Sequence, residues 1–134
     1  MGIRDIIFKN SLSVLVFGEK SKLLQKIFYK ASEFLLNENI KFTNTPNHAD
    51  VLFVCGPISN KLTPYLRETY DKMNSPKWVI ILNEHGINNQ FSSYCVAHDL
   101  SKIIPSDFKI NIDDESDLKA FYHTFIKLKE KISQ

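Results

Sequence analysis

The chain has 134 residues, of which 43% are hydrophobic and 24% charged, and its formal net charge is +2. This length suits one domain with a single hydrophobic core, so we expect residues 1–134 to form one domain with an N-terminal extension over 1–10. So small a net charge gives no argument for nucleic acid or an acidic lipid surface as a partner. No apolar run approaches the ~18 to 20 residues of a membrane span. We therefore expect a soluble, cytoplasmic protein with no transmembrane segment.

The first part of the chain alternates apolar runs with an amphipathic helix. Residues 11–17 (SLSVLVF) are typical of a strand that is buried on both faces. Residues 20–37 carry apolar side chains at three- and four-residue steps, which predicts one amphipathic helix. Residues 40–43 (IKFT) predict a short strand.

The cycle then repeats. Residues 51–55 (VLFVC) indicate a second buried strand, which Gly56 and Pro57 end. A helix is predicted from there to about residue 73, with Pro64 in its first turns, where proline is tolerated. The buried stripe of this helix is predicted to be Leu62, Leu66, Tyr70 and Met73.

The remainder of the chain gives three further signals. Residues 78–82 (WVIIL) predict another buried strand, and the runs 102–105 and 108–111 together offer one more short strand. Residues 113–132 predict a closing helix with acidic residues at its start and lysines at its end, which complements the helix dipole. Strands that alternate with helices predict an α/β fold, a flavodoxin-like or Rossmann-like three-layer sandwich with a mainly parallel sheet.

Ligands of such sheets bind at the carboxyl ends of the strands, so the loops at that edge are the places to look for a site. The loop 18–22 (GEKSK) lacks the glycine patterns of nucleotide-binding loops. Cys55 is either a nucleophile or a core residue, and core packing is favoured because no local pattern supplies a base.

Two polar segments remain at the same predicted edge. Glu84 and His85 could perform acid–base chemistry or bind a metal, but no third ligand follows from the spacing, which favours a solvated loop. The run 113–117 (DDESD) could hold a cation, but it lacks the spacing of an EF-hand loop, and such residues commonly cap helices.

The most distinctive stretch runs from Ala49 to Leu82. It contains A-D-V-L-x-V-x-G, S-N-K-x-x-P-x-L-R, a Tyr-Asp-x-Met helix end and P-K-W-V-I. The segments SLSVLVFG, SSYCVA, KIIPSD and FIKLKEKI lie around it in the sequence. Taken in order, these segments resemble the iron–sulfur small subunit of NADH:quinone oxidoreductase (complex I) and its relatives in membrane-bound hydrogenases. The resemblance implies a flavodoxin-like sheet, in agreement with the predicted elements.

In that family four cysteines bind one 4Fe–4S cluster, and the resemblance places all four ligand positions on other residue types. These positions are Ser21, Lys22, on or beside His85, and Asp113 or Asp114. Cys55 and Cys95 fall elsewhere in the alignment. Because such a cluster takes four thiolates, we expect no cofactor. We also expect Ser21, His85 and Asp113 or Asp114 to gather at one end of the sheet, with Lys22 near an aspartate.

In the family, the loop that matches CGPISNK and the helix after it lie near the large catalytic subunit and the quinone cavity. The candidate partner-binding residues are therefore Gly56, Pro57, Asn60, Lys61, Pro64 and Arg67. The alternative interpretation is ordinary solvation of a helix start and a surface salt bridge worth ~0–1 kcal/mol.

Three functions follow, none of them catalytic by the chain itself. The first is a cluster-less accessory subunit that docks on a large-subunit-like protein of a respiratory or hydrogenase-type complex, peripherally at the inner membrane face. The second is a non-redox member of a working NADH:quinone oxidoreductase that contributes quinone-cavity contacts, and we place it below the first because the chain offers no electron donor. The third is a stand-alone module that binds a small ligand or metal in the vacated cleft.

Overall fold

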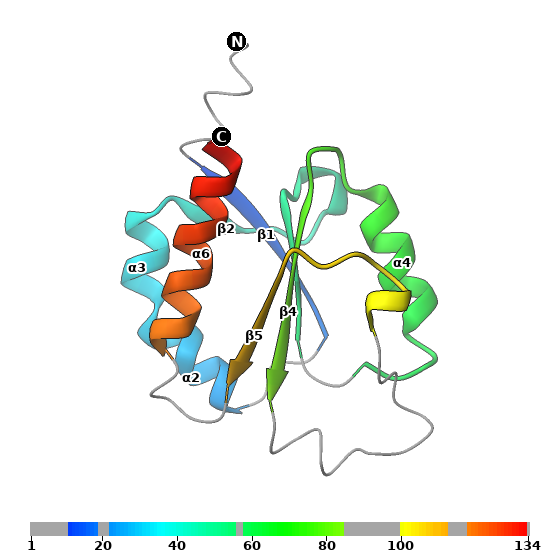
Figure 1. Ribbon diagram of the computed structural model, residues 1–134, viewed down its shortest axis with the longest axis horizontal. Helices are drawn as coiled ribbons and strands as arrows, with labels where there is room; N and C mark the ends of the chain where they lie inside the picture. The colour runs from blue at the N-terminus through cyan, green and yellow to red at the C-terminus, as the bar shows by residue number, and fades with distance from the viewer. Residues whose placement is uncertain (1–10, 19–21, 56–57, 85–99, 113–117, 134) are drawn as a thin grey trace.

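The computed structural model describes residues 11–18, 22–55, 58–84, 100–112 and 118–133. A five-stranded sheet lies at its centre, with every strand parallel to its neighbours and the order β2-β1-β3-β4-β5 (Figure 1). The strands are β1 (Leu12–Phe17), β2 (Ile40–Phe42), β3 (Val51–Val54), β4 (Trp78–Glu84) and β5 (Phe108–Ile112). This order is that of flavodoxin-like doubly wound sheets, so the predicted fold class is confirmed.

Helices cover both faces of the sheet. The helices are α2 (Lys22–Lys30), α3 (Ser32–Asn37), α4 (Thr63–Lys72) and α6 (Leu118–Ser133), with short 3-10 turns η1 (Pro46–His48) and η2 (Leu100–Lys102). Figure 1 shows α2, α3 and α6 on one face and α4 with η2 on the other. Phe53 packs with Phe121 and Phe125 of α6 in the first core layer, and Leu66 of α4 packs with Leu52 in the second. The sheet therefore separates two apolar layers.

The helix predicted over 20–37 is interrupted in the structure. The Ser32 hydroxyl donates to the Tyr29 carbonyl oxygen at 2.8 Å and so competes with the helical backbone for that acceptor. Backbone hydrogen bonds still span the interruption, from Ala31 N–H to the Ile27 oxygen and from Leu35 N–H to the Ala31 oxygen, both at 2.9 Å. The apolar face continues from α2 into α3, as the periodicity predicts.

Only one of the two apolar runs near the C-terminus is a strand. Residues 108–111 lie in β5, whereas η2 begins the segment around 102–105 and Ile104 N–H donates to the Leu100 carbonyl oxygen at 3.1 Å. Ile104 is nevertheless buried, at 1% exposure, in the layer beneath α4. Its apolar character therefore reflects packing from a turn.

Two aspartates extend the sheet at its amino edge in the same way. Asp50 precedes β3, and its carboxylate accepts from Ser13 N–H at 2.9 Å. Asp107 precedes β5, and its carboxylate accepts from Val79 N–H at 2.8 Å. Each carboxylate thus satisfies a backbone donor of the neighbouring strand that would otherwise lack a partner near the buried sheet.

Candidate functional site

The carboxyl ends of β1, β3, β4 and β5 lie at one edge of the sheet. The register aligns Phe17 with Val54, Val54 with Ile81, and Ile81 with Lys109. Beyond this row β4 and β5 continue together for three more residues, to the pair Glu84 and Ile112. At ~3.3 Å per residue, this half of the sheet extends about 10 Å past the ends of β1 and β3. The edge is therefore stepped.

Most of the residues at the predicted cluster positions lie outside the described part of the chain. These residues are Ser21, His85, Asp113 and Asp114; Gly56, Pro57 and Cys95 also lie outside it. The strands that lead toward them end at Phe17, Glu84 and Ile112, all at the stepped edge. Their gathering around one cavity stays a prediction. Among the residues that the structure does describe, no group of three or more His, Cys, Asp or Glu is placed to hold a metal ion.

Lys22 is the one predicted cluster position that the structure describes. It is the first residue of α2, and its side chain is exposed. An ammonium group carries three donors and no acceptor, so it cannot replace a thiolate as a ligand to iron.

Gly18 and Cys55 form a tight contact where β1 and β3 end. Gly18 has φ +101°, and a Cβ built on it would lie 2.4 Å from the Cys55 carbonyl oxygen and 3.1 Å from Ile58 Cδ1. Only glycine fits this conformation and this approach. Cys55 itself is completely buried in the core layer beneath α2 and α6, so its predicted core role is confirmed.

A second candidate region surrounds the start of α4. We call it the α4 surface, and its residues are Asn60, Lys61, Leu62, Pro64 and Tyr65, all of which are exposed. Leu62 is 42% exposed and Tyr65 61% exposed, which is high for large apolar side chains. The hydroxyl of Thr63 donates to the Asn60 carbonyl oxygen at 2.8 Å and so stabilises the turn that presents them.

The prediction that Leu62 belongs to the buried stripe is wrong. Leu66 and Met73 are buried as predicted, but Leu62 lies in the turn before α4 begins and extends one turn beyond the core that receives Leu66. Tyr65 was not a candidate from the sequence. Its position off the apolar stripe, at a three-residue step from Leu62, is the signal that could have identified it.

Arg67, one of the predicted partner-binding residues, already makes several contacts within the chain. Its guanidinium lies 3.2 Å from both carboxylate oxygens of Asp71 and donates to the Ile103 carbonyl oxygen at 3.0 Å. It also lies 5.4 Å from the centre of the Tyr70 ring. Arg67 thus links α4 to the segment after η2, although 52% of its side chain remains exposed.

No helix of the described residues has both the length and the apolar character that crossing a bilayer requires.

Comparison with known proteins adds sequence relatives and a structural neighbour. No family model matches the chain. Over 95 residues it is 33% identical to the B-type subunit of NADH-quinone oxidoreductase from Mycobacterium sp. (strain JLS) and 32% identical to the protein of that name from Mycolicibacterium gilvum (strain PYR-GCK). Each match covers 70% of this chain and 51% of the relative, so the chain spans about half the length of the curated relatives it matches.

The fold is also similar to that of a chain in the structure of the membrane-bound sulfane sulfur reductase, an archaeal respiratory membrane complex. The TM-score is 0.73 with 19% sequence identity, and the match covers 98% of this chain and 75% of the other. At this identity the likeness establishes the shared fold.

Proposed function

We propose that this chain, which is a divergent relative of the B-type subunit of NADH-quinone oxidoreductase, is a non-redox subunit of a respiratory membrane complex. The observation that carries the proposal is the sequence likeness over 95 residues. In the proposed assembly the chain docks on a large-subunit-like protein and associates with the membrane peripherally, through the complex.

The donor groups of the chain do not fit the cluster that the resemblance implies. A 4Fe–4S cluster takes four cysteine thiolates, and the sequence contains two cysteines. One of them, Cys55, is buried among core side chains, and an exposed lysine occupies one of the aligned ligand positions. The role that we propose is therefore structural, and electron transfer belongs to other subunits.

The α4 surface is the proposed contact with the large-subunit-like partner. Leu62 and Tyr65 give it an apolar centre, and Asn60 and Lys61 give it a polar margin. Interfaces commonly combine a buried apolar or aromatic centre with a polar rim, and tyrosine is enriched among the residues that contribute most to binding. Arg67 supports this surface from behind, through its bonds to Asp71 and Ile103.

Affinity purification of the tagged chain at native expression tests the proposal. We expect a large-subunit-like protein to co-purify, and we expect the double variant Leu62→Ala, Tyr65→Ala to lower its yield at least about tenfold, since loss of one central aromatic typically costs ~2 kcal/mol. The matched control is Ile126→Ala, because Ile126 is 41% exposed on α6, on the other face of the sheet. Recovery of the chain alone would contradict docking, and an equal yield from both variants would remove the α4 surface from it.

A further inference from the structure

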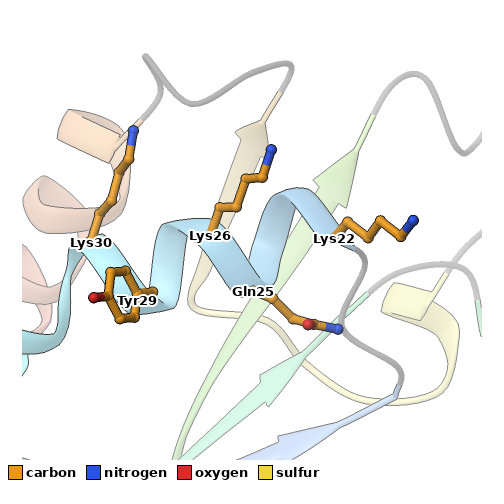
Figure 2. Close-up of a pocket in the computed structure, with 5 residues that line it drawn as sticks. All are labelled: Lys22, Gln25, Lys26, Tyr29 and Lys30. Carbon is orange, nitrogen blue, oxygen red and sulfur yellow. The ribbon is translucent and has the colours of Figure 1, made fainter.

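The exposed side of α2 forms a surface that the proposed function leaves unused. Five exposed side chains, which we call the α2 face, surround an open hollow of about 520 Å³; they are Lys22, Gln25, Lys26, Tyr29 and Lys30. Figure 2 shows the three lysines projecting along one side of the helix and Gln25 and Tyr29 along the other. Tyr29 is 82% exposed, the largest value among the exposed large hydrophobic residues of the described chain.

The charges of the α2 face do not favour the helix that carries them. Lys22, Lys26 and Lys30 follow one another at four-residue steps, so each step places two positive charges one turn apart, ~6 Å along the axis. Lys22 is also the first residue of α2, where the helix dipole favours a negative charge, and the sequence KLLQKIFYK contains no acidic residue. Helix stability therefore gives no reason for this arrangement.

Cationic side chains on two other described helices are arranged differently. On α4, Lys72 lies 3.0 Å from Glu68, and Arg67 lies 3.2 Å from Asp71. On α6, Lys131 lies 3.7 Å from the Asp107 carboxylate. The two cations of α4 thus have carboxylates of their own helix one turn away, whereas α2 is uniformly positive along its length.

We propose that the α2 face is a docking surface for an acidic segment of a partner protein. Carboxylates on successive turns of a partner helix are spaced ~6 Å apart, which matches the lysine spacing, and an apolar residue of the same segment would cover the Tyr29 ring. A membrane surface fits less well, because basic sites for anionic lipids usually gather about 4–8 Lys or Arg, whereas this face has three lysines.

This inference goes beyond the proposed function because it concerns a second surface. The α2 face and the α4 surface belong to helices on opposite faces of the sheet (Figure 1), so one partner, or two, can occupy both at the same time. Loss of binding through one surface is therefore separable from loss through the other by variants of each helix.

Zero-length carbodiimide cross-linking of the natively expressed full chain tests the inference, because it joins lysine amines to carboxylates only where the two are in contact. We expect cross-links from Lys22, Lys26 or Lys30 to an acidic segment of another protein. We expect the triple variant Lys22→Gln, Lys26→Gln, Lys30→Gln to reduce the co-purified amount of that protein about tenfold. Tyr29→Ala should also reduce it.

Matched controls come from the same chain. Lys119→Gln with Lys127→Gln removes two exposed lysines of α6, and Leu36→Ala shortens a side chain that is 76% exposed on α3; neither should change the yield. Cross-links from the α2 lysines only to carboxylates of this chain would overturn the proposal. So would flotation of the purified chain with phosphatidylserine vesicles at physiological salt together with an unchanged protein yield from the triple variant.

Discussion

The helices α2 and α4 bury similar apolar faces against opposite sides of the sheet but expose very different ones. The charges of α4 are mixed, so that Arg67 meets Asp71 and Lys72 meets Glu68, one turn apart. The charges of α2 are all positive, and they lie beside a tyrosine that contacts solvent over most of its surface. The buried faces explain why both segments are helices; only the exposed faces distinguish a helix of mixed charge from a uniformly positive one that suits an acidic partner.

The largest expected effect tests the part that the two helices share. Leu24 of α2 and Leu66 of α4 are both completely buried, so Leu24→Ala and Leu66→Ala should each lower the free energy of unfolding by ~2–5 kcal/mol. Urea denaturation followed by circular dichroism measures this. If only one variant were destabilised, the two helices would not be equal parts of the fold, and the comparison would fail.

A smaller effect is expected from the charges of α4. Arg67→Ala removes the contacts with Asp71 and the bond to the Ile103 carbonyl, but the side chain is half exposed, so we expect a loss of only about 1 kcal/mol. The same denaturation experiment applies, with Arg67→Lys as a partial replacement that keeps the charge but not the planar donor geometry. Unchanged stability in Arg67→Ala would mean that Arg67 does not hold α4 to the segment after η2.

On α2 the sign should reverse. Lys26→Glu gives Lys22 and Lys30 an opposite-charged neighbour in place of a like-charged one, and should raise the free energy of unfolding by about 0.5–1 kcal/mol. Lys26→Gln, which only removes the repulsion, should give about half of that gain. Both gains should shrink in ~1 M salt. Destabilisation by Lys26→Glu would show that the lysines stabilise the fold and would remove the contrast between the helices.

The smallest expected effect is the loss of one exposed pair on α4. Glu68→Gln separates Lys72 from its carboxylate, and exposed pairs of this spacing contribute ~0.3–0.5 kcal/mol. Its sign is the informative part, because removing a charge from α4 should destabilise the chain whereas removing one from α2 should stabilise it. A thermal denaturation series at low salt compares the two variants directly.

Much of the fold could be predicted from the sequence because buried parallel strands are nearly continuous apolar runs. The runs at 11–17, 51–55 and 78–82 coincide with β1, β3 and β4, and they determine the sheet that the helices must cover. The break between α2 and α3 could not be predicted in this way, since it depends on whether the Ser32 hydroxyl or a backbone amide takes the Tyr29 carbonyl.

The candidate site was less accessible from sequence patterns. Periodicity assigns Leu62 to a buried stripe, but it does not say where the core ends, and the helix begins one residue later. Arg67 resembles a partner contact in the sequence, yet the carbonyl that it binds belongs to Ile103, 36 residues away. Such long-range partners are properties of the folded chain.

The central claim is that this relative of an NADH-quinone oxidoreductase subunit has a structural role without a cluster of its own, and its most direct test is the iron content of the chain. The full chain should be purified anaerobically, incubated with iron, sulfide and a thiol reductant, and then desalted for iron analysis and visible absorption. The account predicts a colourless protein with no stoichiometric iron, because two cysteines cannot provide four thiolates. A brown protein that retains about four irons per chain would contradict it.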